Sequence, residues 1–166
     1  MWFTIYSLRF TVAEKNYKQT VNNKKFASCV KDANFFCMLQ TGIKGHHEQV
    51  VTPAMSAARV GSGLVDVFAT PMLVALIEQT CYESVLPHLD EGQGTVGTLV
   101  NVSHVSATPI GMRVWCDSEL VEVDRRRLEF SVKAYDEAGL IGEGTHERFI
   151  IVSAKFMEKL KAKTKS

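Results

Sequence analysis

The chain has 166 residues and a formal net charge of +1, with 46% hydrophobic and 22% charged residues. This length and composition fit a globular domain with a sizeable core, and the near-neutral charge gives no electrostatic reason to expect a nucleic acid as partner. No apolar run approaches the roughly 18 residues that cross a membrane, so we expect no membrane partner. The first residues also lack the basic start and clean apolar run of a secretory signal.

Four cysteines are present, and no two of them are spaced as C-x-x-C. They are Cys29, Cys37, Cys81 and Cys116. This pattern indicates a reduced, cytoplasmic chain rather than a disulfide framework. No Cys or His pair has zinc-finger spacing, so we expect no metal site. The adjacent His46 and His47 would point to opposite faces of a strand, and we interpret them as solvated loop residues.

Residues 1–37 differ from the rest of the chain. Their net charge is +4, which leaves −3 for residues 38–166, and they show no sustained helical or strand period. Met38 then opens "MLQTGIKG", which is typical of a natural start. Two interpretations stand side by side: an upstream extension that adds little to the fold, or an ordinary N-terminal helix or tail. We expect residues 38–166 to form the functional domain.

The next elements are a strand and a long helix. Residues 46–60 suit one strand and a turn, with Pro53 as a breaker. Thr70 is a good N-cap residue and Pro71 a good first helical residue, so a helix is predicted from Thr70 to about Leu86, where Pro87 stops it. Apart from Glu78, the first turns of this helix are almost entirely apolar, which requires burial on most sides.

Four strands are predicted after the helix, over residues 95–106, 112–123, 127–136 and 140–152, followed by a short basic helix around "AKFMEKLKAK". In the first of these strands one face carries alternate residues, namely Val96, Thr98, Val100, Val102 and His104. A long apolar helix followed by antiparallel strands predicts an α+β fold in which a curved antiparallel sheet wraps around a central helix.

Glu78 is the carboxylate in this apolar helix, and burying it alone would be costly. It lies eight residues after Thr70, roughly 80° past two full turns, so both residues fall on a broadly common side. His104 should face the same helix–sheet seam. A carboxylate near an imidazole is a common arrangement for acid–base or nucleophilic catalysis. Each residue also has a plainer interpretation: a helix cap, a solvent-facing glutamate and a satisfied core histidine. Gly97 would let a substrate approach the backbone closely.

Three ordered blocks, "VFATPMLVALIEQTC", "GQGTVGTLVNVSHVSATPIGM" and "GEGTHERFII", closely resemble the fluoroacetyl-CoA thioesterase-like family of hot-dog-fold proteins. The resemblance covers residues from about 42 to the C-terminus. It implies a long helix held in an antiparallel sheet, and a homodimer with active sites at the subunit interface. The family's catalytic residues fall on Thr70, Glu78 and His104, and a family glycine falls on Gly97.

One stretch departs from the family pattern. Members selective for the fluorinated substrate carry bulky aromatics just before the helix, whereas this chain, in "GSGLVDVF", has Gly63, Leu64 and Val65 where the aromatic lid would be expected. Leu64 and Phe68 are therefore the expected substrate-binding residues here, and the resemblance does not imply selectivity for fluoroacetyl-CoA. The basic residues Arg125, Arg126 and Arg127, together with the C-terminal lysines, are candidates for binding CoA phosphates, although a solvated turn and tail would explain them equally well.

The resulting hypothesis is an acyl-CoA thioesterase that hydrolyses a small or short-chain acyl-CoA to the free acid and CoA. Glu78 would act as nucleophile or as general base, His104 would activate water and stabilise the oxyanion, and Thr70 would hold Glu78 or the thioester oxygen. No metal or bound cofactor is needed. Two alternatives remain: a non-catalytic acyl-CoA-binding protein on the same scaffold, and a related dehydratase or hydratase, whose usual Asp/His motif we do not find.

Overall fold

The structure is a computed structural model that describes residues 39–163, so the prediction about residues 1–37 lies outside the described residues. Most of the secondary structure follows the order expected from the sequence. The elements are β1 (Lys44–Val50), a 3₁₀ turn (Pro53–Met55), α2 (Ala57–Val60), α3 (Thr70–Val85), a second 3₁₀ turn (Leu86–His88), β2 (Gln93–His104), β3 (Arg113–Asp124), β4 (Arg127–Asp136), β5 (Gly139–Val152) and α4 (Ser153–Lys163).

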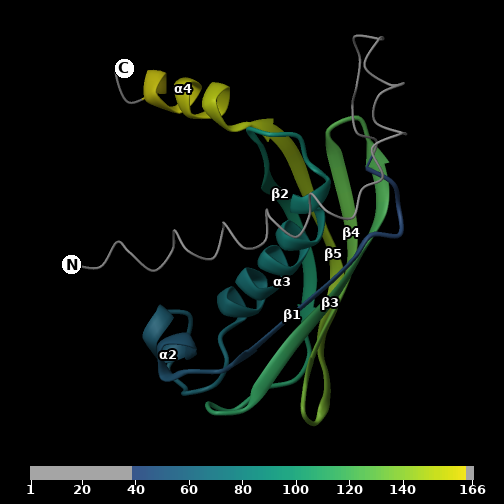
Figure 1. Ribbon diagram of the computed structural model, residues 1–166. Helices are drawn as coiled ribbons and strands as arrows, with labels where there is room; N and C mark the ends of the chain where they lie inside the picture. Colours follow the sequence, from purple (N-terminus) through teal and green to yellow (C-terminus); the bar gives the residue numbers. More distant parts are fainter. Residues whose placement is uncertain (1–38, 164–166) are drawn as a thin grey trace, which may run out of the picture. The chain divides into compact units, whose positions relative to one another are not determined.

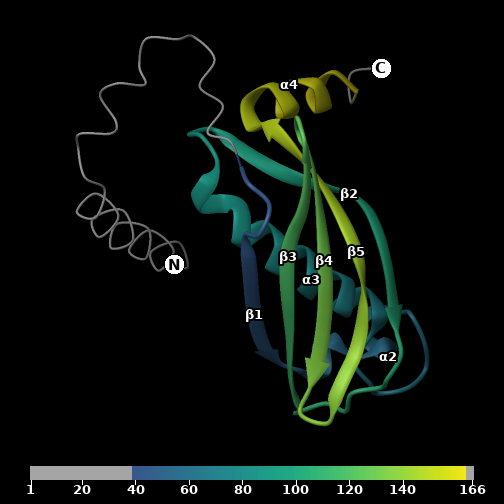
Figure 2. The same ribbon diagram turned by 90° about the vertical axis from the view of Figure 1, so that its right-hand side faces the viewer.

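The described strands form one five-stranded antiparallel sheet in the order β1-β3-β4-β5-β2. Figure 2 shows this order across the sheet, with β1 and β2 at opposite edges. Helix α3 runs along one face of the curved sheet (Figure 1). The predicted α+β class, a long helix held against a curved antiparallel sheet, is confirmed. Among the described strands β2 pairs with β5 alone, which leaves its outer backbone edge open.

The core lies between α3 and the inner face of the sheet. Leu73, Leu76, Ile77, Cys81 and Val85 recur three or four positions apart, so they form one stripe along α3, and each is at most 1% exposed. Full burial of one such side chain stabilises a fold by about 1.5–3 kcal/mol. The strands meet this stripe with alternate residues, including Val114, Cys116, Leu120, Leu128, Phe130, Val132 and Ile150.

Thr70 does not cap α3, contrary to the sequence prediction. The capping residue is Ala69, with extended backbone angles of φ −77° and ψ 141°, and no side chain caps this end. Thr70 is the first helical residue and Pro71 follows it. Proline near the start of a helix costs no intrahelical hydrogen bond, because the first N–H groups have no partner within the helix. The hydroxyl of Thr70 is thereby left for another contact.

The prediction of which β2 residues face the helix is wrong for the first half of the strand, because β2 contains a β-bulge. The pairing with β5 shifts after Gly97, so Thr98 is an extra residue that inverts the alternation. Before the bulge Thr95 is buried and Gly97 approaches α3, in place of the predicted Val96 and Thr98. After the bulge the predicted face is correct, and it ends in His104.

His46 and His47 lie on strand β1, so their interpretation as loop residues is wrong. They point to opposite faces, as adjacent strand residues must. His46 Nδ1 lies 2.7 Å from Asp117 Oδ1 on β3, and His47 Nδ1 lies 2.9 Å from Glu83 Oε2 on α3. Both imidazoles therefore have carboxylate partners.

The predicted basic helix near the C-terminus is present as α4. None of its residues is buried, and its last turn carries Lys161 and Lys163. No helix in the described part of the chain is both long enough and apolar enough to pass through a membrane.

Candidate active site

Thr70 and His104 meet where α3 begins and β2 ends. Thr70 Oγ1 lies 2.9 Å from His104 Nδ1, a hydrogen bond between the two elements. The ring of Phe68 lies edge-on to the imidazole, with 6.3 Å between ring centroids and an interplanar angle of 78°. All three residues line a hollow of ≈310 Å³. Its walls otherwise consist of small or apolar residues, namely Ala57, Ser62, Val67, Ala69, Val105, Ser106 and Ala107.

The surroundings of His104 favour the neutral imidazole, which is the form that can act as a general base. Burial lowers the pKa of the imidazole from its ordinary value of 6.5, against a smaller opposing effect of a backbone hydrogen bond at Ser106. The ring is therefore mainly neutral at pH 7, with one lone pair to accept a proton. Its Nε2 atom is buried and has no hydrogen-bond partner among the described residues. Thr70 thus holds one nitrogen, and the other has no partner within the described chain.

Within one chain, Glu78 lies on α3 away from the Thr70–His104 pair. Eight helical residues separate it from Thr70, which corresponds to roughly 12 Å along α3. Its Oε2 atom lies 3.3 Å from Arg148 Nη1, and its side chain is 41% exposed. A Cβ atom at Gly97 would lie 2.9 Å from the same oxygen, so the glycine gives this carboxylate room against β2. The structure therefore brings Thr70 and His104 together at the predicted seam, while Glu78 faces the seam further along.

Sequence reasoning missed the polar cluster behind Glu78. Arg148 on β5 is buried, and its guanidinium donates to Thr95 Oγ1 at 2.8 Å, to the Thr95 carbonyl at 3.1 Å and to the Glu78 carbonyl at 3.3 Å. His146, also buried, lies beside it. A buried guanidinium is tolerated only when it is paired and hydrogen-bonded. The signal was present in the sequence, because His146 and Arg148 alternate with the apolar Ile150 on one face of a strand.

The other predicted binding residues lie outside the hollow at Thr70. Leu64 is 99% exposed and does not line it. Arg125 has a positive φ of 55° in the tight turn between β3 and β4. Arg126 stacks over Phe149, with 5.1 Å from its guanidinium carbon to the ring centroid. Arg127 is held by carboxylates, with ion pairs to Glu122, Glu129 and Glu147 at 2.6, 3.2 and 3.3 Å.

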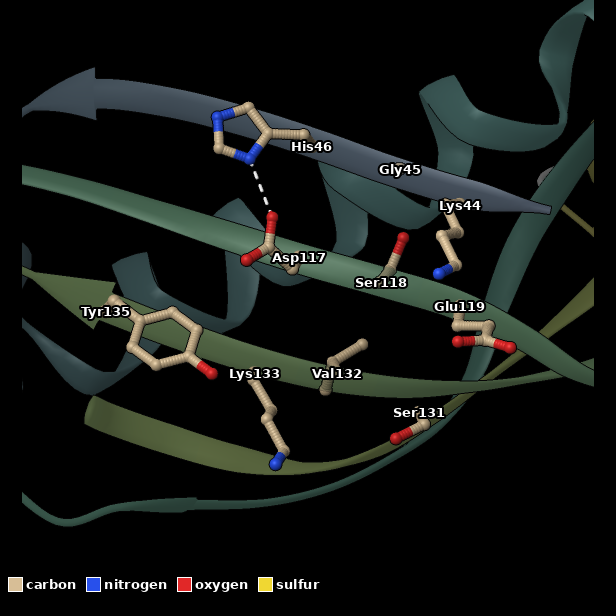
Figure 3. Close-up of a pocket in the computed structure, with 10 residues that line it drawn as sticks. All are labelled: Lys44, Gly45, His46, Asp117, Ser118, Glu119, Ser131, Val132, Lys133 and Tyr135. Atoms are coloured by element: carbon tan, nitrogen blue, oxygen red, sulfur yellow. Dashed lines mark hydrogen bonds and ion pairs between the residues drawn. The ribbon is translucent and has the colours of Figure 1, made fainter. Parts of the chain in front are cut away.

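A larger hollow of ≈480 Å³ lies over β1, β3 and β4 (Figure 3). Its walls are mainly polar or charged, with the His46–Asp117 pair and Lys44, Glu119 and Lys133 around it. None of Thr70, Glu78 and His104 lines this hollow. Volume alone therefore does not identify the site, and we assign the candidate site to the smaller hollow because it holds the neutral imidazole and the threonine hydroxyl.

Two histidines, the buried His146 and the half-buried His104, predict a loss of stability at mildly acidic pH. Burial lowers the pKa of both His104 and His146 below 6.5. Below that pH the unfolded chain takes up protons that the folded chain still refuses, so the free energy of unfolding falls as pH falls below about 6.5. We expect the melting temperature of the parent protein to fall more between pH 7.5 and pH 5.5 than that of His146→Gln. Equal losses in the two proteins would contradict the prediction.

The family model described as fluoroacetyl-CoA-specific thioesterase matches residues 51–154. The fluoroacetyl-CoA thioesterase of Streptantibioticus cattleyicolor is 43% identical over 99 residues, which cover 60% of this chain and 71% of that protein.

Solved structures agree with the family match. A fluoroacetyl-CoA thioesterase structure superposes with a TM-score of 0.73 at 36% identity, over 76% of this chain and 98% of that one. A variant of the fluoroacetyl-CoA-specific thioesterase has been solved with fluoroacetate and CoA. A Thermus thermophilus member of the thioesterase superfamily gives a TM-score of 0.72 at 31% identity, over 77% of this chain and 95% of that one.

The fold and the comparisons together define the class, which is a hot-dog-fold thioester hydrolase, as the sequence predicted. Within that class, the chain belongs to the fluoroacetyl-CoA-specific thioesterase family.

Proposed function

We propose that this protein hydrolyses a small or short-chain acyl-CoA to the free acid and CoA, using Thr70, Glu78 and His104. The observation that carries the proposal is the 2.9 Å contact between Thr70 and a largely neutral His104 beside a hollow of ≈310 Å³. In a chain of a thioesterase family, this pair supplies a hydroxyl and a base next to a space that suits a small acyl group.

Glu78 joins this site through a second copy of the chain. Glu78 and His104 of one chain lie too far apart to act on one carbonyl, since roughly 12 Å of helix separates Glu78 from the threonine that holds His104. The open edge of β2 can pair with β2 of a second copy. Antiparallel pairing about a two-fold axis between Val100 and Asn101 would place Gly97 of one copy opposite His104 of the other.

Exposure along β2 and α3 supports this homodimer. Leu99 and Val100 on the edge strand are 50% and 37% exposed, which is costly for apolar residues beside an unpaired backbone edge. The 41% exposure of the Glu78 side chain in the single chain leaves room for a partner to cover it. The same pairing would bring Glu78 of one copy close to the Thr70–His104 pair of the other.

Two chemical routes use this composite site. In one, the Glu78 carboxylate attacks the thioester carbonyl, CoA leaves as the thiolate, and water hydrolyses the resulting anhydride. In the other, Glu78 takes a proton from water as the water attacks the thioester carbonyl, and the C–S bond then breaks so that CoA leaves as the thiolate. In both, His104 delivers or accepts a proton. The hydroxyl of Thr70 contacts His104 rather than Glu78 within the chain, so its proposed partners are the imidazole and the thioester oxygen.

The remainder of the substrate would meet basic side chains. Arg125, Arg126 and the lysines of α4 are candidates for the CoA phosphates, whereas Arg127 is already neutralised by three carboxylates.

The two described cysteines, Cys81 and Cys116, are free and buried, and burial raises the pKa of their thiols to about 12 and about 11. Unpaired thiols fit a cytoplasmic enzyme.

Release of free thiol from acetyl-CoA and a panel of longer acyl-CoA esters, followed colorimetrically, tests the proposal. We expect turnover with short acyl chains. The His104→Gln variant should lose it, and His47→Gln should retain it as a matched control, because His47 pairs with Glu83 away from the site. An acyl-CoA binder without catalysis would bind the same esters and release no thiol, which would overturn the proposal.

The missing aromatic lid leads to a prediction about specificity. Leu64 occupies the stretch where an aromatic lid was expected, and its side chain is 99% exposed. A site without that lid has little with which to distinguish fluorine from hydrogen on the acyl group, and even a whole methylene group in a hydrophobic pocket changes rates by only about 10–200-fold. We expect kcat/KM for fluoroacetyl-CoA to stay within about tenfold of that for acetyl-CoA. A preference of several orders of magnitude, measured with both substrates, would show that the prediction is wrong.

A further inference from the structure

His146 is a buried histidine that the mechanism above does not use. Its side chain is 0% exposed and lies between β2 and the guanidinium of Arg148. On one side its Nδ1 atom lies 2.7 Å from the carbonyl oxygen of Leu99, the residue that follows the Thr98 bulge. On the other side its Nε2 atom lies 3.1 Å from Arg148 Nη1. The ring thus joins the bulge in β2 to the residue that contacts Glu78.

These two partners fix the tautomer of the ring. A carbonyl oxygen only accepts a hydrogen bond and a guanidinium only donates. Both contacts are satisfied together when His146 is neutral, with its proton on Nδ1 and its lone pair on Nε2 facing Arg148. Burial lowers the pKa of the imidazole, and the charge of Arg148 adds to this effect. The hydrogen bond to the Leu99 carbonyl and the charges of Glu78 on α3 and Glu147 on β5 act in the opposite direction. A protonated ring would turn an N–H toward a cation.

The guanidinium of Arg148 contacts Thr95 on one side and His146 and Glu78 on the other. The same nitrogen, Nη1, contacts both His146 and Glu78. Its Nε and Nη2 atoms donate to Thr95, on β2 before the bulge. Its Nη1 atom donates to His146 Nε2 and to both the carbonyl and the Oε2 atom of Glu78. Because the guanidinium is planar, its three nitrogens move together. Loss of the acceptor at His146 would remove one of the contacts that fix this plane and would let the whole group shift about its contacts with Thr95. The contact that keeps the Glu78 carboxylate against Gly97 would then loosen.

We propose that His146 is a positioning residue, which as a neutral acceptor orients Arg148 so that the guanidinium fixes the carboxylate of Glu78 for the reaction. This inference rests on the proposed function of Glu78. His146 does not line the hollow at Thr70, and it acts through Arg148 alone.

Paired substitutions test the proposal through kinetics. His146→Leu removes both hydrogen bonds at similar volume, and we expect kcat to fall roughly 10- to 100-fold with KM changed little, because a carboxylate misplaced by about 1 Å loses that much rate. His146→Gln keeps one donor and one acceptor and should recover part of the loss. Phe130→Leu is the matched control, since Phe130 stacks on the His146 ring at 6.5 Å and makes no hydrogen bond to it. An equal kcat loss in Phe130→Leu would overturn the proposal by assigning the effect to packing.

Combination with Glu78→Gln separates this inference from the proposed function. If His146 works through Glu78, His146→Leu should cost nothing further in a Glu78→Gln background. Two losses that multiply would overturn the positioning role while leaving the role of Glu78 intact. A Glu78→Gln protein with parental activity would instead overturn the proposed function.

The protonation state of the His146 ring is also observable directly in the parent protein. In ¹⁵N-labelled protein, the imidazole nitrogen resonances of His146 should report a neutral ring protonated on Nδ1 at pH 7 and at pH 6, with His146→Gln used for assignment. A charged ring at pH 7, or a proton on Nε2, would overturn the proposal.

Discussion

Replacing Glu78 with glutamine should reduce kcat at least about 10²-fold, because general acid–base groups contribute roughly 10²–10⁴-fold to a rate. The amide keeps the shape of the side chain and can still accept a hydrogen bond from Arg148, but it can neither attack a thioester nor take a proton from water. The fold should change little, because the side chain is 41% exposed in the single chain and does not belong to the buried stripe of α3.

The control for this variant is Gln79→Glu, which places a carboxylate one position further along the exposed side of the same helix. It should retain parental activity and, combined with Glu78→Gln, should not restore it, because Gln79 is turned toward Glu83. The melting temperatures of all three proteins show whether folding is preserved. A folded Glu78→Gln protein that hydrolyses acyl-CoA at near the parental rate would show that Glu78 has a structural role only.

Substitution of Gly97 by alanine should also cause a large loss of activity. The added Cβ atom would lie 2.9 Å from Glu78 Oε2 and 3.1 Å from His146 Cε1. The carboxylate is the flexible partner, so it moves away and loses its position relative to the substrate. We expect kcat to fall roughly 10- to 100-fold, the penalty for displacing a reacting group by about 1 Å, with only a modest change in melting temperature.

Gly94→Ala is the matched control for Gly97→Ala. It adds the same methyl group three residues earlier in the same strand, where the new Cβ atom would only meet Ser153 Oγ at the ordinary contact distance of 3.6 Å. Steady-state kinetics of the two variants should therefore separate a local effect on Glu78 from a general effect of alanine in β2. If Gly97→Ala kept parental kcat, the close approach of Glu78 to this strand would have no bearing on catalysis.

Much of the fold was predictable because local patterns determine it. The Thr–Pro start and the apolar run predict α3, and the strands predicted over residues 112–123, 127–136 and 140–152 match β3, β4 and β5 to within a residue. The face of β2 was not predictable in the same way. A bulge at Thr98 depends on pairing with β5, and a period of two read from one strand does not reveal an extra residue.

The candidate site was predictable in its residue types but not in its arrangement. Helical periodicity places Thr70 and Glu78 on one side of α3, yet it says nothing about the roughly 12 Å between them along the axis unless the rise per residue is also considered. The cluster of Arg148 and His146 depends on contacts between β5, β2 and α3, which lie far apart in sequence. A charged residue on the core face of a strand was the available signal.

The central claim is that Glu78 of one copy and His104 of another act in the same active site. Complementation tests it directly: Glu78→Gln and His104→Gln proteins, each inactive alone, are unfolded together, refolded as a mixture and assayed for thiol release. In a composite site each mixed dimer regains one intact centre. With random pairing the mixture should recover about one quarter of the parental activity, since half of the dimers are mixed and half of their sites are complete. Refolded parent protein and each variant refolded alone are the controls. Activity of the mixture no higher than that of either variant alone would contradict a site shared between two copies.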